Sequence, residues 1–362
     1  MKNTFGNQIT LTLFGESHGE AIGVVLDGLA PGIDVDFDEI KRLLSLRRPS
    51  GKISTARCET DEFSIVSGVF GGKTTGTPLC IIIPNTDTRS RDYSDIIGKA
   101  RPAHADYTAS VKYNGFEDYR GGGHFSGRIT AALVAAGGIL IPALKKKGIY
   151  IGTHMKSCAG VPDREFGDIL SDIKALSDMA FPVLCEDAAE EMRARIEDAA
   201  KDGDSVGGIL ETAVVGLPAG VGEPWFDTLE GVLSHAIFSV PAVKGVEFGG
   251  GFSLSDMRGS ESNDPYRIVD GKIVTETNNQ GGIGGGISNG MPLIIRSAVK
   301  PTPSIYKEQK TVDFINKENI DFTIKGRHDP CICHRARIVI DSVCALAISD
   351  MLATKYGTDY LA

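Results

Sequence analysis

Two histidines and a run of arginines, all set among glycines, are the residues best suited to chemistry in this chain. His18 lies within Gly15-Glu-Ser-His-Gly19, and His104 lies within Arg101-Pro-Ala-His-Ala-Asp-Tyr107. Histidine titrates nearest to neutral pH, so either imidazole could hold or release a proton during a reaction. A lone histidine is more often structural than catalytic, and the residues around each one decide between the two roles.

The stretch Arg120-Gly-Gly-Gly-His-Phe-Ser-Gly-Arg128 is a candidate anion site. Three consecutive glycines leave backbone amides bare, and Ser126 can cap the helix that follows them. Unpaired amides at a helix start, with Arg120 and Arg128 beside them, suit a phosphate or a carboxylate. The alternative is a glycine-rich turn that only leads into a core helix.

The charge distribution indicates a small polyanionic ligand. The net charge of −9 argues against general nucleic-acid binding, which usually requires a basic domain. The arginines nevertheless gather around the glycine-rich stretches, although any single one could instead pair with a surface carboxylate. The arginines in question are Arg47, Arg48, Arg57, Arg101, Arg120, Arg128, Arg327, Arg335 and Arg337.

Strands and helices that would position these residues can be read from the apolar pattern. Asp36 with Glu39 resembles a capping box and predicts a helix to about Leu46, which Pro49 terminates. Other expected elements are a strand through Ile9, Leu11 and Leu13, a buried strand from Leu79 to Ile83, and long helices over Gly127 to Lys147 and about Ile332 to Lys355.

The chain also shows an internal correspondence. Gly15 to Gly32, aligned with Gly203 to Gly220 at a constant offset of 188, shares six identical residues in eighteen. The pattern of Gly71-Gly72, Gly76 and Pro78-Leu79 recurs as Gly285-Gly286, Gly290 and Pro292-Leu293. Each half then ends in a basic polar segment and a long helix, so we expect an internal duplication.

A duplicated chain of 362 residues is expected to form one body, because two similar halves bury matching apolar faces against each other. We therefore predict an α/β fold of the α+β type, a single domain over residues 1–362. Its pseudo-symmetric halves are expected at about 1–150 and 203–362, joined by a helical connection over about 161–202. The predicted elements are helices and antiparallel strands.

Composition bears on the compartment. The chain is 41% hydrophobic, and its longest apolar runs carry glycines and a proline and fall short of a lipid-spanning segment. The N-terminus leads into a strand rather than a signal peptide. Seven cysteines without a repeating CxxC frame indicate reduced thiols, so we expect a cytoplasmic protein.

Two further motifs are set aside at this point. Cys331-x-Cys333-His334 could ligate a metal, but a second ligand pair at suitable spacing is missing, so we interpret the thiols as buried or incidental and expect no metal. Ser17 and His18 are adjacent, and on an extended backbone they would point to opposite faces and could not form a hydrogen-bonded dyad.

Four motifs in order resemble the signatures of the chorismate synthase family, and the likeness spans nearly the whole chain. The motifs are Gly15-Glu-Ser-His-Gly19 through Asp27-Gly28, Arg101-Pro-Ala-His-Ala-Asp-Tyr107, Arg120-Gly-Gly-Gly with Ser126-Gly-Arg128, and Gly326-Arg-His-Asp-Pro-Cys331.

The resemblance implies a lyase that converts 5-enolpyruvylshikimate 3-phosphate to chorismate and phosphate by 1,4-anti elimination, in aromatic amino-acid biosynthesis. It implies reduced FMN as cofactor without net redox change, NADPH as a candidate reductant, a homotetramer, and helices sandwiched between antiparallel sheets. No nucleic acid and no membrane partner are expected.

The resemblance also implies a set of site residues. Arg47 and Lys52 match positions tied to NADPH, and Lys52, His124-Phe125 and Pro241 depart from the family's common residues. Arg48, Arg128 and Arg337 are expected to bind the anionic substrate. Flavin contacts are expected from His124, Phe125, Ser126, Pro241, Ala242, Gly285, Lys300, Pro301, Thr302, Pro303, Ser304 and Arg327.

Roles in the reaction follow from the family mechanism. His104 is expected to protonate the departing phosphate and His18 the reduced flavin, with Asp329 taking a proton from flavin N5. Ser17 and Ser126 would tune the hydrogen bonds around flavin and substrate. The alternatives are a non-catalytic flavin or phosphosugar-binding protein, and a phosphosugar transferase that works without flavin.

Overall fold

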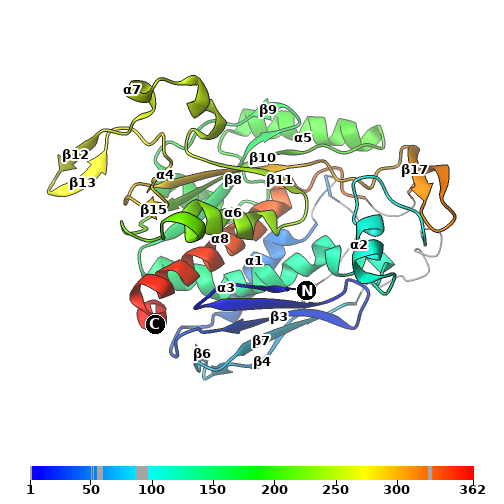
Figure 1. Cartoon of the computed structure of the whole chain (residues 1–362), viewed down its shortest axis with the longest axis horizontal. Helices are drawn as coiled ribbons and strands as arrows, with labels where there is room; N and C mark the ends of the chain where they lie inside the picture. The colour runs from blue at the N-terminus through cyan, green and yellow to red at the C-terminus, as the bar shows by residue number, and fades with distance from the viewer. Residues whose placement is uncertain (1, 50, 52, 55–59, 87–96, 325–327) are drawn as a thin grey trace.

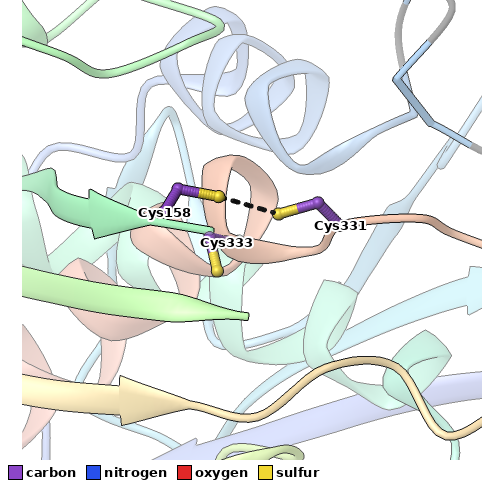
Figure 2. A group of neighbouring side chains, drawn as sticks. All are labelled: Cys158, Cys331 and Cys333. Atoms are coloured by element: carbon purple, nitrogen blue, oxygen red, sulfur yellow. Dashed lines mark hydrogen bonds between the residues drawn. The ribbon is translucent and has the colours of Figure 1, made fainter. Parts of the chain in front are cut away.

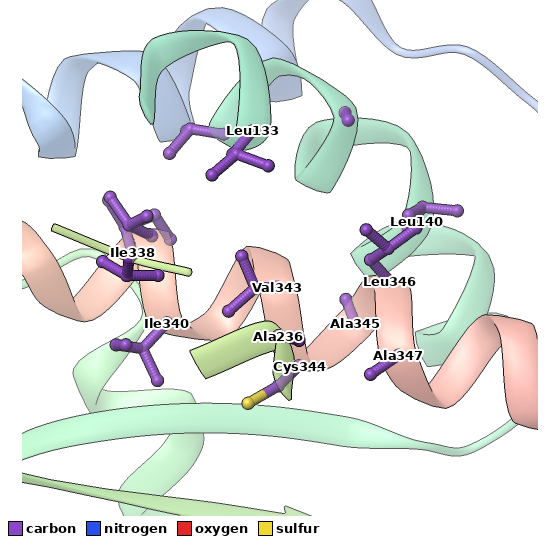
Figure 3. Close-up of a cluster of buried hydrophobic side chains, with 14 of the residues drawn as sticks. Leu133, Leu140, Ala236, Ile338, Ile340, Val343, Cys344, Ala345, Leu346 and Ala347 are labelled. Carbon is purple, nitrogen blue, oxygen red and sulfur yellow. The ribbon is translucent and has the colours of Figure 1, made fainter. Parts of the chain in front are cut away.

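Two strongly apolar helices, α3 (Thr130–Lys146) and α8 (Cys333–Tyr356), form the centre of the molecule. A helix that is apolar on all sides must be buried on all sides, and nearly every α3 residue up to Leu144 is buried. Figure 3 shows Leu133 and Leu140 of α3 on one side of Ile338 and Val343 of α8. The helix pair is therefore the core around which the sheets are arranged.

Close packing of these helices depends on glycine. A Cβ atom on Gly137 would lie 2.3 Å from the Ser342 hydroxyl, and one on Gly138 would lie 2.7 Å from Ile40. The absence of side chains at these two positions lets α3 contact both α8 and α1 (Phe37–Arg47). A larger residue at either position would push the helices apart.

The stretch Gly127–Lys146 is, by length and composition, long and apolar enough to cross a membrane. Of its most apolar window, 83% is buried inside the protein. Its apolar surface is thus already covered by α1, α8 and two strands of the first sheet.

The first sheet is antiparallel and has the strand order β1-β2-β3-β7-β4. In β7 the alternate residues Leu79, Ile81 and Ile83 are buried, as expected for a strand with one face on the core. Its strands are β1 (Thr4–Phe5), β2 (Thr10–Gly15), β3 (Ala21–Asp27), β7 (Leu79–Pro84) and β4 (Ser64–Ser67).

The second antiparallel sheet has the order β11-β16-β10-β8-β9 and lies on the other side of the helices (Figure 1). Strands β8 and β10 contact α8, whereas β3 and β7 contact α3. The predicted sandwich of helices between antiparallel sheets is confirmed. The strands are β11 (Val243–Phe248), β16 (Leu293–Val299), β10 (Gly208–Val215), β8 (Tyr150–Cys158) and β9 (Val161–Pro162).

Four strands of the two sheets correspond in sheet order and in chain order. The order β2-β3-β7-β4 matches β8-β10-β16-β11, and α1 and α3 correspond to α6 (Leu229–Phe238) and α8. The edge strands differ, because β1 precedes β2 whereas β9 follows β8. The second set begins with β8 at Tyr150, earlier than residue 203. Duplication as the origin of this correspondence stays a prediction.

The structure is a computed structural model, and it describes all residues except 1, 50, 52, 55–59, 87–96 and 325–327. The remaining elements connect or extend the two sheets and the central helices. The expected connection between the halves holds two helices, α4 (Ile169–Leu176) and α5 (Glu186–Lys201). The others are α2 (Asp106–Tyr113), α7 (Gly259–Ser262), β5 (Val69–Phe70), β6 (Lys73–Thr74), β12 (Tyr266–Val269), β13 (Lys272–Thr275), β14 (Ile283–Gly284), β15 (Ile287–Ser288), β17 (Gln309–Asp313) and β18 (Glu318–Phe322).

Candidate active site

A cavity of about 250 Å³ lies where α1 ends and where α3 and α8 begin. We call it the arginine cavity, because the charged residues that line it in the described part of the chain are Arg47, Arg48, Arg128, Arg335 and Asp329. Guanidinium groups match the geometry of phosphate and carboxylate oxygens. The excess of positive charge therefore favours an anionic ligand.

Asp61 is the buried counter-ion beside the arginine cavity. Its carboxylate accepts a hydrogen bond of 2.9 Å from Arg47 and forms an ion pair with Arg128. Burial alone would raise the pKa of Asp61, but the two guanidinium charges outweigh it and hold that pKa below its ordinary value. Arg128 also donates to Asn85 Oδ1 at 3.0 Å, so a network holds this guanidinium before any ligand binds.

Two further hydrogen-bond donors lie at the cavity. The Nε atoms of Arg47 and Arg48 are buried and have no hydrogen-bond partner among the residues that the structure describes. A buried polar group without a partner costs about 1–3 kcal/mol, which a ligand that accepts its hydrogen bond would recover. Arg335 donates to Asp329 at 2.8 Å and to the Arg47 carbonyl at 2.8 Å.

The glycine turn lies between the two candidate histidines. It forms part of a distorted 3-10 helix, η2 (Arg120–Phe125), in which Gly121, Gly122 and Gly123 have φ values of 58°, 83° and 53°. A Cβ atom on Gly121 would lie 2.3 Å from His18 Nδ1, and one on Gly122 would lie 3.2 Å from His104 Cε1. Positive φ and close contact together explain why glycine occupies this turn.

Ser17 and His18 are hydrogen-bonded to each other, with 2.9 Å between Oγ and Nδ1. The expectation that they could not form such a pair is wrong, because they lie in a turn after β2 rather than on extended backbone. Ser17 Oγ also donates to the Gly121 carbonyl at 3.1 Å. When it does so, Nδ1 of His18 donates to Oγ, which leaves Nε2 as the atom that gains or loses a proton.

His104 lines a second cavity of about 320 Å³, together with Gly122 and Phe125. Arg101 donates to its Nδ1 at 3.2 Å and is itself paired with Asp106 at 2.6 Å. Burial and the positive charge of Arg101 lower the pKa of His104 to about 4, against the opposing charge of Asp106. The imidazole of the free protein is therefore neutral at pH 7.

The loop after β16 joins this region to the flavin residues that the resemblance implies. Lys300 donates from Nζ to the Ala103 carbonyl at 2.6 Å and from its backbone to the Ala242 carbonyl at 3.0 Å. Thr302 Oγ1 is buried and has no hydrogen-bond partner within the described ranges. Of the implied flavin residues, Pro241 and Ser126 line the arginine cavity, and the Lys300 backbone bond ties the loop after β16 to Ala242, the neighbour of Pro241.

Three predicted site residues are not placed at the arginine cavity by the structure. Arg337 lies two residues after Arg335 on α8, a rotation of about 200°, and donates to the Met179 carbonyl at 2.8 Å, in a different cavity from the arginine cavity. Arg337 therefore lies apart from the arginine cavity within one chain, and its expected role in binding the substrate stays a prediction. Lys52 and Arg327 lie outside the described residues.

Gly285 is also remote from the other flavin residues. It lies in the turn between β14 and β15, whose neighbour Gly286 accepts from the backbone of Leu229 at the start of α6. Pro241 follows the other end of α6, roughly 15 Å away along ten residues. Figure 1 places β15 and α2 at opposite ends of the molecule.

The two residues before Ser126 are placed by neighbouring elements. His124 donates from Nδ1 to the Gly15 carbonyl at 2.8 Å, which fixes its ring against β2. Phe125 packs edge-on against Tyr113 of α2, with 6.0 Å between ring centres. Phe125 therefore remains at the second cavity, next to Gly122.

Sequence reasoning missed two carboxylates of the site, Asp61 and Asp106, and the contact of Arg101 with His104. Asp61 stands in no motif, and only the tertiary structure brings it to Arg47 and Arg128. Arg101 and Asp106 were available as a signal, because they flank His104 within the same motif. Their pairing shows that they set the charge around that histidine.

The chain is similar to known proteins over nearly its whole length. A family model described as chorismate synthase matches residues 9–353. The chorismate synthases of Thermococcus kodakarensis and Pyrococcus abyssi are each 47% identical over 347 residues, which cover 96% of this chain and 96% of theirs. A crystal structure of chorismate synthase superposes with a TM-score of 0.77 at 28% identity, covering 98% of this chain and 94% of that one.

Proposed function

The chain belongs to the chorismate synthase family, and we propose how its own residues carry out the family's reaction. It is an enzyme, a lyase that converts 5-enolpyruvylshikimate 3-phosphate to chorismate and phosphate in the shikimate pathway. The family uses a reduced flavin, and here we propose FMN. The observation that carries the proposal is the arginine cavity, adjoined by a glycine turn with a histidine on each side.

The arginine cavity binds the anionic groups of the substrate. A molecule with one phosphate and two carboxylates requires several cations, and Arg48, Arg128 and Arg335 supply them. The unpartnered Nε of Arg48 is a donor for this purpose. Asp61 keeps Arg128 in place, so the geometry exists before the substrate arrives.

His104 is the acid for the departing phosphate. It is neutral in the free protein, because burial and the neighbouring cations disfavour its charged form. A bound phosphate brings negative charge that offsets Arg101 and Lys300 and raises the pKa of His104. Substrate binding thus lets His104 take up from solvent the proton that it then gives to the leaving phosphate.

His18, Asp329 and the two serines act on the cofactor side. A bound reduced flavin supplies an electron-rich ring and is not consumed. His18 holds a proton on Nε2 that balances the charge of that ring, while Ser17 orients the imidazole through Nδ1. Asp329 accepts a proton on its carboxylate, and Ser126 orients the turn that separates the cavities.

Flavin contacts from His124, Phe125, Ser126, Pro241, Ala242 and Lys300 to Ser304 are part of the proposal. Arg47 is the candidate for contact with NADPH, and its buried pairing with Asp61 adds a role within the arginine cavity. We propose that the enzyme relies on reduced FMN supplied from outside the chain. A cytoplasmic location is proposed as well.

Assembly into a homotetramer is proposed on the basis of exposed apolar side chains. Trp225 and Phe226, which precede α6, are 85% and 94% exposed. Large apolar side chains at that exposure favour contact with another copy. Gly285 lies close to this surface, since Gly286 packs on Thr228, so assembly could bring Gly285 to a flavin on a neighbouring chain.

Phosphate release from the enolpyruvyl substrate, with and without chemically reduced FMN under anaerobic conditions, tests the proposed cofactor and acid. Release that requires reduced FMN is expected. Release without flavin would favour a phosphosugar transferase, and an altered flavin spectrum without release would favour a non-catalytic binding protein.

A further inference from the structure

Three cysteines and a histidine outside the arginine cavity come together at the start of α8. Cys158 is the last residue of β8, whereas Cys331 and Cys333 lie just before and at the start of the helix. Figure 2 shows the sulfurs of Cys158 and Cys331 facing each other, with Cys333 beside them and its sulfur turned away from that pair. All three are fully buried. The motif Cys331-x-Cys333 lacked a further ligand in the sequence, and the fold supplies Cys158 from 173 residues away.

The sulfur positions suit a tetrahedral metal. The Sγ atoms of Cys158 and Cys331 are 3.6 Å apart, and those of all three cysteines lie within 4.8 Å of one another. A tetrahedral zinc ion with Zn–S bonds of about 2.3 Å separates its sulfur ligands by about 3.8 Å. The observed spacing therefore needs a contraction of about 1 Å at most.

His334 is the candidate for the fourth ligand. It follows Cys333 in the sequence and is buried, but its ring nitrogens do not lie within 4.8 Å of all three Sγ atoms, so the ring must turn toward them to ligate. Its Nε2 is 2.9 Å from Ser54 Oγ, whereas its Nδ1 is buried without a hydrogen-bond partner among the described residues. A metal-binding histidine commonly donates its other ring N–H to such a partner, which leaves the remaining nitrogen free to ligate.

We propose that Cys158, Cys331 and Cys333 form a structural zinc site, which His334 completes as the fourth ligand when its ring turns toward the three thiolates. Three thiolates and one imidazole are a ligand set that zinc takes in closed, tetrahedral sites. Gly208 of β10 packs against this group, since a Cβ atom there would lie 3.2 Å from Cys333 Sγ. A cavity of about 280 Å³ that reaches His334 gives access from the surface.

The zinc would fasten the end of β8 to the first turn of α8. Asp329 lies two residues before Cys331, and Arg335 lies two residues after Cys333. Both residues line the arginine cavity, so the metal would brace the segment that carries them without contacting the substrate. The inference does not depend on the proposed function.

Metal analysis of the full-length protein, purified without chelators from zinc-containing medium, tests the site. We expect about one zinc per chain in the wild type, as for a closed structural site. Cys158→Ser should lower that content at least about tenfold, the scale of change for lost metal-site interactions. Cys344→Ser is the matched control, because Cys344 is also fully buried and lies in α8 but outside the cluster; it should keep its zinc.

Cobalt substitution covers the case in which a variant fails to fold. The wild-type protein, stripped of metal and given Co²⁺, should show thiolate-to-cobalt charge transfer and the strong visible bands of tetrahedral cobalt. A wild-type protein without zinc whose cobalt spectrum lacks thiolate bands would overturn the proposal. A Cys158–Cys331 disulfide found by mass spectrometry in freshly purified protein would overturn it too.

Discussion

The protonation of His104 is expected to depend on the substrate. In the free protein its pKa is lowered to about 4 by burial and by the charge of Arg101. At pH 7 roughly one molecule in a thousand would then carry the proton. A general acid that is protonated in so small a fraction of molecules would be inefficient, so the bound ligand must raise the pKa of His104.

The rise in the pKa of His104 on phosphate binding can be calculated from the charges. A unit negative charge about 4 Å from the imidazolium contributes about 4 kcal/mol at an effective dielectric constant of about 20. One pKa unit corresponds to about 1.4 kcal/mol, so a bound phosphate should raise the pKa of His104 by about three units, to about 7. Because binding then takes up a proton, substrate affinity should rise as the pH falls through that value.

Ring proton NMR of the histidines measures this directly, with His104→Gln identifying the signal. Without reduced flavin the substrate binds without turnover, so the complex can be titrated between about pH 5 and pH 9, a range that spans the expected midpoint. Lys300→Met is a control, because removing this cation should raise the pKa of His104 in the free protein. A free-protein midpoint near the ordinary 6.5, or a complex in which His104 stays neutral at pH 6, would refute the reasoning.

Three further outcomes are expected. His18→Ala and His104→Ala should each bind FMN and substrate yet lose at least about a hundredfold in turnover, measured as phosphate release; near-normal turnover would remove that histidine from the mechanism. Gly121→Ala should lower turnover and destabilise the protein by about 1–3 kcal/mol in denaturant unfolding, because of its positive φ and its contact with His18; wild-type behaviour would contradict the turn geometry. Asp61→Asn should cost about 3–5 kcal/mol of unfolding free energy, because it leaves two buried guanidinium groups without their charge partner; a change below about 1 kcal/mol would show that solvent screens the pairs.

Local signals in the sequence were sufficient for much of the fold. The Asp36 carboxylate caps α1 by accepting from the backbone N–H groups of Asp38 and Glu39, as predicted, whereas the Glu39 carboxylate pairs with Arg42 and does not complete a capping box. The long helix after Ser126 forms as expected, although its first turn, Gly127–Ile129, is a 3-10 helix. These features depend on neighbours in sequence, and such neighbours are visible without a structure.

Contacts between distant segments could not be predicted in the same way. The pairing of Asp61 with Arg128 joins residues 67 positions apart, and nothing in the sequence near Asp61 indicates it. Likewise, the placement of Arg337 on the far side of α8 from Arg335 depends on where the helix is packed. The bond between Ser17 and His18 requires the turn that the glycine stretch stabilises, since Ser17 N–H donates to the Gly123 carbonyl.

The two central helices both begin at the arginine cavity, so their backbones present their positive ends to the same ligand. Each aligned set of peptide dipoles acts like roughly half a positive charge at the helix start. Together they supply close to one charge that no side-chain substitution removes. Variants that lack one arginine should therefore retain weak affinity for inorganic phosphate, and this residual binding should respond less to salt than binding at an exposed lysine.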